Sequence, residues 1–189
     1  LLAPAATLIS AKQNQIGLAY LRLALRLDPQ RDDGWVMLGD VLQQQGDVDG
    51  ARAAYLRPKP SSNEFSAAQS KLAWSYQSAG DKVQALKLAR VAAATGDLNG
   101  RLTLADLLAA NETYPEAIEI WNGLIAEGKT ADWQVYYARG RAYERTGRWK
   151  EAEADLSKAL SMRPDEAELL NYLGYAWIDR GERLPEAMA

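Results

Sequence analysis

Residues 133–164 read WQVYYARGRAYERTGRWKEAEADLSKALSMRP, and this stretch decides the fold of the chain. Its apolar residues recur three and four positions apart on both sides of Gly147, which is the pattern of two amphipathic helices joined by a tight turn. Similar stretches begin at four other positions, Asp32, Ser66, Leu98 and Ala167. The sequence therefore predicts one helical hairpin repeated along the chain.

The expected turns of these five hairpins keep a nearly constant spacing. They fall at Gly46, Gly80, Glu112, Gly147 and Gly181, so successive turns are 34, 32, 35 and 34 residues apart. A period in this range is typical of solenoids, in which each hairpin packs on its neighbours along the chain. Strand signals are nearly absent, because β-branched residues are scattered and never alternate. We therefore predict an all-α solenoid of antiparallel helix hairpins.

We expect one array over residues 1–189. It divides into a partial repeat, four full repeats and a last repeat truncated in its second helix, at residues 1–31, 32–65, 66–97, 98–132, 133–166 and 167–189. Pro58 and Pro60 should end the second helix of the 32–65 repeat early, near Leu56, because proline lacks an amide donor. Since the chain starts and stops inside repeats, we interpret it as a piece of a longer protein.

Local signals also predict caps and helix crossings. Ser61 with Glu64, and Thr113 with Glu116, have the spacing of capping boxes at helix N-termini. Paired helices approach closely only where side chains are small. We expect the crossing residues of the first helices, Gly39, Ala73, Ala105, Gly140 and Gly174, to face small residues of the second helices, Ala51, Ala85, Ala117 and Ala152.

Composition excludes several classes of function. The chain has 189 residues, 22 Lys and Arg against 25 Asp and Glu, and a formal net charge of −3, which argues against a nucleic-acid partner. It has no cysteine and no histidine, so the usual zinc and haem ligands and most catalytic nucleophiles and bases are missing. We predict no cofactor, no metal and no enzymatic activity, and no apolar run is long enough to span a bilayer.

The repeats resemble tetratricopeptide repeats. In one copy the resemblance rests on Trp35, Leu38, Gly39, Leu42, Gly46, Ala51 and Tyr55, and in another on Tyr136, Gly140, Tyr143, Gly147, Trp149, Ala152, Leu156, Ala159 and Pro164. This resemblance implies a right-handed superhelix whose concave wall is lined by the first helix of each hairpin. It also implies a scaffold or adaptor that binds a protein or peptide partner in that groove.

Counting along each copy assigns fourteen residues to the concave wall. They are Val36, Asp40, Gln43, Ser70, Trp74, Gln77, Leu102, Asp106, Tyr137, Arg141, Glu144, Asn171, Tyr175 and Ile178. Exposed aromatic residues in a groove are typical anchors for a peptide or helix. Trp74, Tyr137 and Tyr175 are the candidate anchors, and the alternative is that each packs against a neighbouring hairpin.

Arg139 stands where the family usually has leucine, and we expect its aliphatic stem to cover core surface while its charged head reaches water or an acid such as Asp155. Nearby basic residues, including Arg141, Arg145 and Arg148, alternate with glutamates, which is typical of solvated surface rather than a phosphate site. An acid–base site built from Asp40 and Asp106 is a further alternative.

A rival function is a self-assembling structural scaffold, so a homo-oligomer is possible. The last copy, NYLGYAWIDRGERLPEAMA, is similar to repeats of long envelope-associated bacterial proteins. That similarity favours the periplasm or cell envelope and a role in envelope or polysaccharide-export machinery.

Overall fold

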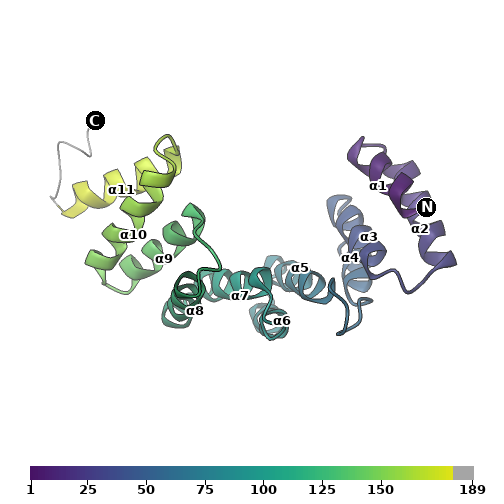
Figure 1. Cartoon of the computed structure of the whole chain (residues 1–189), viewed down its shortest axis with the longest axis horizontal. Coiled ribbons are helices and arrows are strands. Elements are labelled where there is room, and N and C mark those ends of the chain that lie inside the picture. The colour runs from purple at the N-terminus through teal and green to yellow at the C-terminus, as the bar shows by residue number, and fades with distance from the viewer. Residues whose placement is uncertain (181–189) are drawn as a thin grey trace. The chain divides into compact units, whose positions relative to one another are not determined.

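The protein is an all-α helical repeat array, seen here in a computed structural model that describes residues 1–180 apart from the side chain of Asp179. The predicted turn at Gly181 and the second helix of the last repeat lie outside the described residues. Figure 1 shows the helices in chain order: α1 Leu2–Ser10, α2 Asn14–Leu27, α3 Asp32–Gln44, α4 Val48–Tyr55, α5 Phe65–Ser78, α6 Lys82–Ala93, α7 Leu98–Ala110, α8 Tyr114–Ala126, α9 Trp133–Arg145, α10 Trp149–Met162 and α11 Ala167–Arg180.

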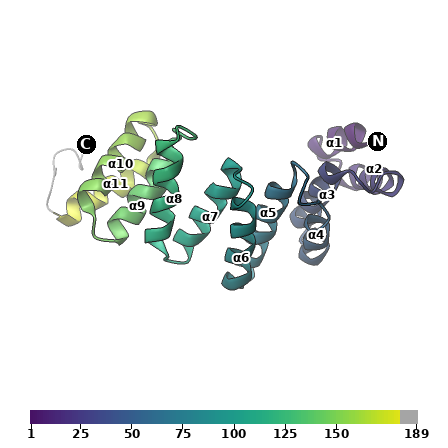
Figure 2. The ribbon, with the colours of Figure 1, turned by 60° about the horizontal axis from the view of Figure 1, so that its bottom comes forward.

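The chain forms two compact units, Leu1–Leu107 and Leu108–Ala189. In the first unit α1 packs on α2, α3 on α4 and α5 on α6, and the second helix of one hairpin contacts the first helix of the next. Figure 2 shows α5 and α6 side by side. In the second unit α9 packs on α8 and α10, and α10 also contacts α11. Within each unit, neighbouring hairpins therefore stabilise one another, as in other solenoids.

Five tight turns share one backbone geometry. The second residue after each first helix has a positive φ, and these residues are Lys12, Gly46, Gly80, Glu112 and Gly147, with φ of 60°, 81°, 83°, 62° and 75°. The next amide in each turn donates to the carbonyl five residues back, for example Asp47 N to Leu42 O at 3.0 Å. This Schellman-type bond satisfies a carbonyl at the helix end. Glu112 therefore takes the left-handed conformation in spite of its side chain.

Three expectations about helix ends can be compared with the structure: the early end of α4 is confirmed, and the two capping boxes are not. α4 ends at Tyr55, as Pro58 and Pro60 predict. Both expected capping boxes are wrong. Thr113 forms no side-chain cap bond, and its hydroxyl instead donates to Asn111 O at 3.4 Å. The helix expected after Ser61 starts later, at Phe65, and Ser62 Oγ accepts from Glu64 N at 3.1 Å.

The helix crossings also differ from expectation in their partners. A Cβ added to Gly39 would lie 2.3 Å from Tyr55 Cε1, and one added to Gly140 would lie 3.0 Å from Leu156 Cγ. The crossing glycines therefore face large side chains one helical turn beyond the expected Ala51 and Ala152. Both alanines are fully buried, so they still occupy the hairpin core.

Candidate functional site

The first candidate site is a cavity of about 400 Å³ between α3, α4 and α5. It combines three predicted wall residues, Asp40, Gln43 and Trp74, with five others, Gln44, Tyr55, Lys71, Ser75 and Ser78. The successive first helices α3 and α5 contact each other, which places their outward positions around one hollow. We call this hollow the α3–α5 groove.

Asp40 is the polar centre of the α3–α5 groove. Its Oδ1 accepts from Tyr55 OH at 2.8 Å and lies 2.8 Å from Lys71 Nζ. Burial, reinforced by the hydrogen bond to Asp40, raises the pKa of Tyr55 above its usual value. Asp40 is therefore engaged by two neighbours and does not supply the free carboxylate that the acid–base alternative with Asp106 requires.

Trp74 is the large exposed side chain of this groove, with 41% of its surface accessible. The α5 backbone beside it is anchored from α4. Arg52 donates from Nε to Ser75 Oγ at 2.9 Å and from Nη2 to Ser75 O at 2.8 Å, and its guanidinium lies 4.0 Å from the Tyr76 ring centroid. The indole thus stands on a fixed helix while its own face remains open.

The second candidate site is a cavity of about 730 Å³ on α9 and α11, which we call the α9–α11 groove. Three predicted wall residues, Glu144, Tyr175 and Ile178, line it together with Arg145, Tyr172 and Ala176. Tyr175 is 73% exposed and Ile178 is 49% exposed. Like the α3–α5 groove, this cavity therefore presents an open aromatic side chain next to charged groups.

A cluster of aromatic and charged residues fixes α9 to α11 below this groove. The rings of Tyr137 and Tyr172 meet edge to face at 5.6 Å, and the Arg141 guanidinium lies 5.4 Å from each ring centroid. Tyr172 OH donates to Glu144 Oε2, and Tyr137 OH donates to Glu168 Oε1 at 2.9 Å. Burial, with these hydrogen bonds, raises the pKa of both phenols to about 12.

The structure corrects the expected wall for three residues. Val36, Ser70 and Tyr137 are each 8% exposed, so their side chains pack inside the protein rather than facing a partner. The remaining predicted residues keep some exposure. Arg141, Asp106 and Asn171 are exposed, and Gln77 and Leu102 are half-buried.

Sequence reasoning missed two groove residues that matter. Lys71 lies one helical turn before Trp74, and this spacing could have placed it on the same face. Tyr172 carries no such signal, because its position depends on how α11 packs against α9. Among the described residues no group of three or more carboxylates could hold a metal ion.

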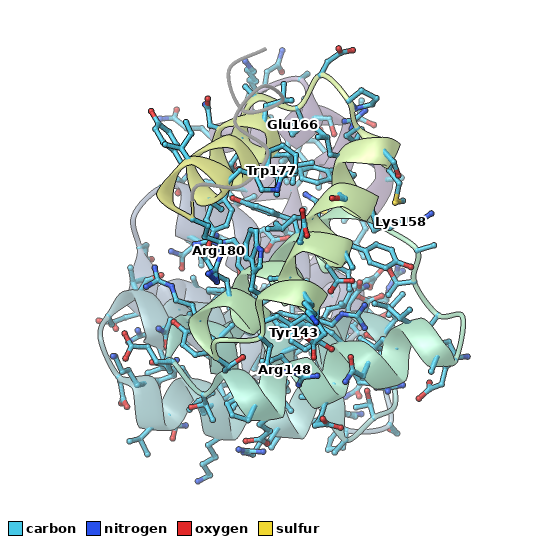
Figure 3. The ribbon with its side chains drawn as sticks, turned by 90° about the vertical axis from the view of Figure 1, so that its left-hand side faces the viewer. Tyr143, Arg148, Lys158, Glu166, Trp177 and Arg180 are labelled. Atoms are coloured by element: carbon cyan, nitrogen blue, oxygen red, sulfur yellow. The ribbon has the colours of Figure 1, made fainter. Side chains whose placement is uncertain are left out.

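Arg139 is a structural residue, as the sequence predicts. It forms a two-pronged pair with Asp155 and also donates from Nη1 to Asn122 Oδ1 at 2.8 Å, which links α8, α9 and α10. Burial alone would lower the pKa of Arg139, but the hydrogen bond and the charge of Asp155 raise it above its usual value. Tyr143 OH also donates to Asn122 Oδ1, at 3.1 Å, and Figure 3 shows Arg148 beside Tyr143.

The hairpins, their turns and their groove-lining first helices define a helical repeat protein of the solenoid class. Two family profiles described as tetratricopeptide repeat match the chain, one over residues 7–64 and the other over residues 133–166. The chain is a tetratricopeptide repeat protein. Proteins of this family are generally scaffolds for protein–protein interaction, and the fold supports that class of function. No curated protein matches the chain in sequence.

Several solved structures share this fold. MamA is 23% identical, with a TM-score of 0.66, over 80% of this chain and 88% of that chain. YrrB, described as a tetratricopeptide repeat protein with an unusual peptide-binding site, is 20% identical, with a TM-score of 0.66, over 88% of this chain and 86% of that one. A tetratricopeptide repeat protein from Parabacteroides merdae is 20% identical, with a TM-score of 0.70, over 98% of this chain and 73% of that one. At these identities the likeness concerns the fold alone.

None of the described helices is long and apolar enough to cross a membrane.

Proposed function

We propose that the protein is an interaction scaffold that binds a peptide or a partner helix in the α3–α5 groove and the α9–α11 groove. The observation that carries the proposal is the matched placement of Trp74 and Tyr175. Each follows directly after the small residue of its first helix, Ala73 or Gly174, and each opens onto a cavity with charged neighbours. Rigid aromatic side chains in such hollows supply much of the binding energy in peptide recognition.

The polar side chains that line the grooves can form hydrogen bonds with the main chain of a bound peptide. In the α3–α5 groove the amides of Gln43 and Gln44 and the hydroxyl of Ser78 lie around the Trp74 indole, and the Asp40–Lys71 pair places both signs of charge nearby. Amide side chains can donate to and accept from a peptide main chain. YrrB, which shares the fold, has a peptide-binding site according to its description, so this fold can carry one.

A display library of random peptides, selected on the wild-type protein, provides the test. Synthetic peptides from the selection are titrated against Trp74→Ala, Tyr175→Ala and the control Val83→Ala, whose side chain is 82% exposed on α6 outside both grooves. We expect one groove variant to weaken a given peptide by about tenfold or more while the control leaves it unchanged. Peptides that bind both groove variants as tightly as the wild type would overturn the proposal.

The alternative function is a self-assembling scaffold in the bacterial cell envelope, such as polysaccharide-export machinery. Val83 and Val91 on α6 favour it, because both are exposed apolar residues away from the grooves. Self-assembly predicts that Val83→Ala with Val91→Ala reduces the oligomeric mass in sedimentation velocity. The groove proposal predicts that Trp74→Ala with Tyr175→Ala abolishes peptide capture and leaves the mass unchanged.

A further inference from the structure

A row of apolar side chains on α2 has no partner among the described residues. Ile16, Tyr20, Leu23 and Leu27 are 53%, 40%, 48% and 69% exposed. The opposite face of the same helix is buried in the hairpin through Leu18, Leu21, Ala24 and Leu25. α2 therefore has two apolar sides, and a helix with so wide an apolar surface is normally covered on both. We call the exposed row the α2 seam.

The spacing of the α2 seam is that of a coiled-coil stripe. Its members are four, three and four residues apart, which is the alternation of a and d positions in a heptad. Over these residues the stripe is about 16 Å long and one side chain wide. Such a stripe fits one helix packed alongside, with its side chains between those of α2.

Among the described helices α10 does not carry this row, so the fold itself does not require it. Counted from the turn residue, the corresponding positions of α10 are Glu151, Asp155, Lys158 and Met162. Lys158 is exposed and extends away from α10 (Figure 3). On α10 two of these positions, Glu151 and Lys158, are charged and exposed, and Asp155 is buried against Arg139, so α10 does not present the continuous exposed apolar row of α2.

The charged residues on and near α2 indicate which kind of partner helix the α2 seam would bind. Residues 1–27 contain Lys12, Arg22 and Arg26 and no aspartate or glutamate, although Asp28 follows directly and the whole chain has a net charge of −3. Arg22 and Arg26 are exposed on α2, and Arg26 occupies a flanking g position of the heptad.

We propose that the α2 seam binds an acidic amphipathic helix of a partner protein, with apolar residues in heptad spacing and Asp or Glu along its flanks. The apolar seam supplies the binding energy, and the cations Arg22 and Arg26 of α2 set the orientation and reject basic helices. This contact is separate from the α3–α5 and α9–α11 grooves. The Trp74→Ala and Tyr175→Ala variants therefore leave it unchanged.

Two designed helical peptides with the same leucine heptads test the proposal, one with glutamate flanks and one with lysine flanks. Each is titrated by fluorescence anisotropy against the wild type, Leu23→Gln and the control Val83→Gln. Leu23 is half exposed, so its substitution should leave the fold intact, and circular dichroism and thermal melting check this. We expect the glutamate peptide to bind the wild type at least about tenfold more tightly than the lysine peptide does. Leu23→Gln should weaken binding of the glutamate peptide about tenfold, whereas the control Val83→Gln should leave it unchanged.

Several results would overturn the proposal. One is no saturable binding of the glutamate peptide, and another is equal binding by the wild type and Leu23→Gln. Leu23-dependent self-association in sedimentation velocity would assign the seam to a second copy. Leu23-dependent binding of phosphatidylglycerol vesicles, without peptide binding, would assign it to lipid. Peptide binding to residues 1–189 that is lost in a longer natural chain would assign it to that chain's own upstream segment.

Discussion

The guanidinium of Arg139 donates to both carboxylate oxygens of Asp155, from Nε to Oδ2 at 2.7 Å and from Nη2 to Oδ1 at 2.7 Å. Both side chains are largely buried, with 14% and 9% of their surface exposed. The same arginine reaches Asn122 on the preceding hairpin. Arg139 therefore links α9 to α10 within its own hairpin and also links α9 to α8 of the preceding hairpin.

Arg139→Leu restores the residue that the family usually has, but it should destabilise this protein. The change leaves the Asp155 carboxylate buried without its partner, which costs about 3 kcal/mol in the free energy of unfolding. Asp155→Ala added to Arg139→Leu should recover much of that loss, because it removes the unpaired charge. Urea unfolding of the single and double variants measures both effects. An Arg139→Leu protein as stable as the wild type would contradict the pairing.

Gly39→Ala and Gly140→Ala should have different effects on stability. At Gly39 the new methyl group would overlap the Tyr55 ring, which is buried and hydrogen-bonded to Asp40. The expected loss is about 1–3 kcal/mol. At Gly140 the nearest atom is 3.0 Å away, and alanine favours the helix by up to about 1 kcal/mol, so the net change should be small. Thermal denaturation of the two variants compares them, and equal melting temperatures would count against the helix crossing at Tyr55.

Glu112→Gly should stabilise the protein. Glu112 has a φ of 62°, which glycine adopts without the steric cost of a Cβ. The gain should be at most about 1 kcal/mol, because glycine also raises the entropy of the unfolded chain. Gly80→Ala is the matched opposite at φ 83° and should destabilise. Chemical denaturation gives both values, and the same sign for the two changes would exclude the shared turn geometry.

Stability should fall above pH 10 because of Tyr137 and Tyr172. Burial and hydrogen bonds to glutamates raise the pKa of each phenol from 10 to about 12 in the folded state. Between these pH values the unfolded phenols lose protons that the folded phenols keep, so rising pH favours unfolding. Urea unfolding from pH 9 to pH 12 measures the decline. Tyr172→Phe should make the decline shallower, and an unchanged slope would show that Tyr172 does not contribute.

Much of the scaffold can be predicted from the residues. The positions of Gly46, Gly80 and Gly147 locate turns, because each supplies the positive φ that ends a helix. The Arg139–Asp155 pair can be anticipated because a buried cation requires an anion within reach. The capping boxes fail because a hydroxyl can bond other backbone groups nearby, as Thr113 does with Asn111.

The candidate grooves could be predicted only in part. Helical spacing places Trp74, Asp40 and Gln43 on the outward faces of successive first helices, and the structure brings them around one cavity. The same counting places Val36, Ser70 and Tyr137 on the wall, although all three are buried. Whether an outward position is open depends on the width and tilt of the neighbouring helix, which no local spacing specifies.

The sequence by itself determined the repeated hairpin, its period and its turns, because these depend on interactions within a few residues or across one helix pair. Tertiary structure decided which side chains remain open to a partner. Tyr137 is covered by α11, whereas Tyr175, Trp74 and the α2 seam stay exposed. Burial is a property of the packed assembly of helices, so it appears only when the hairpins are stacked.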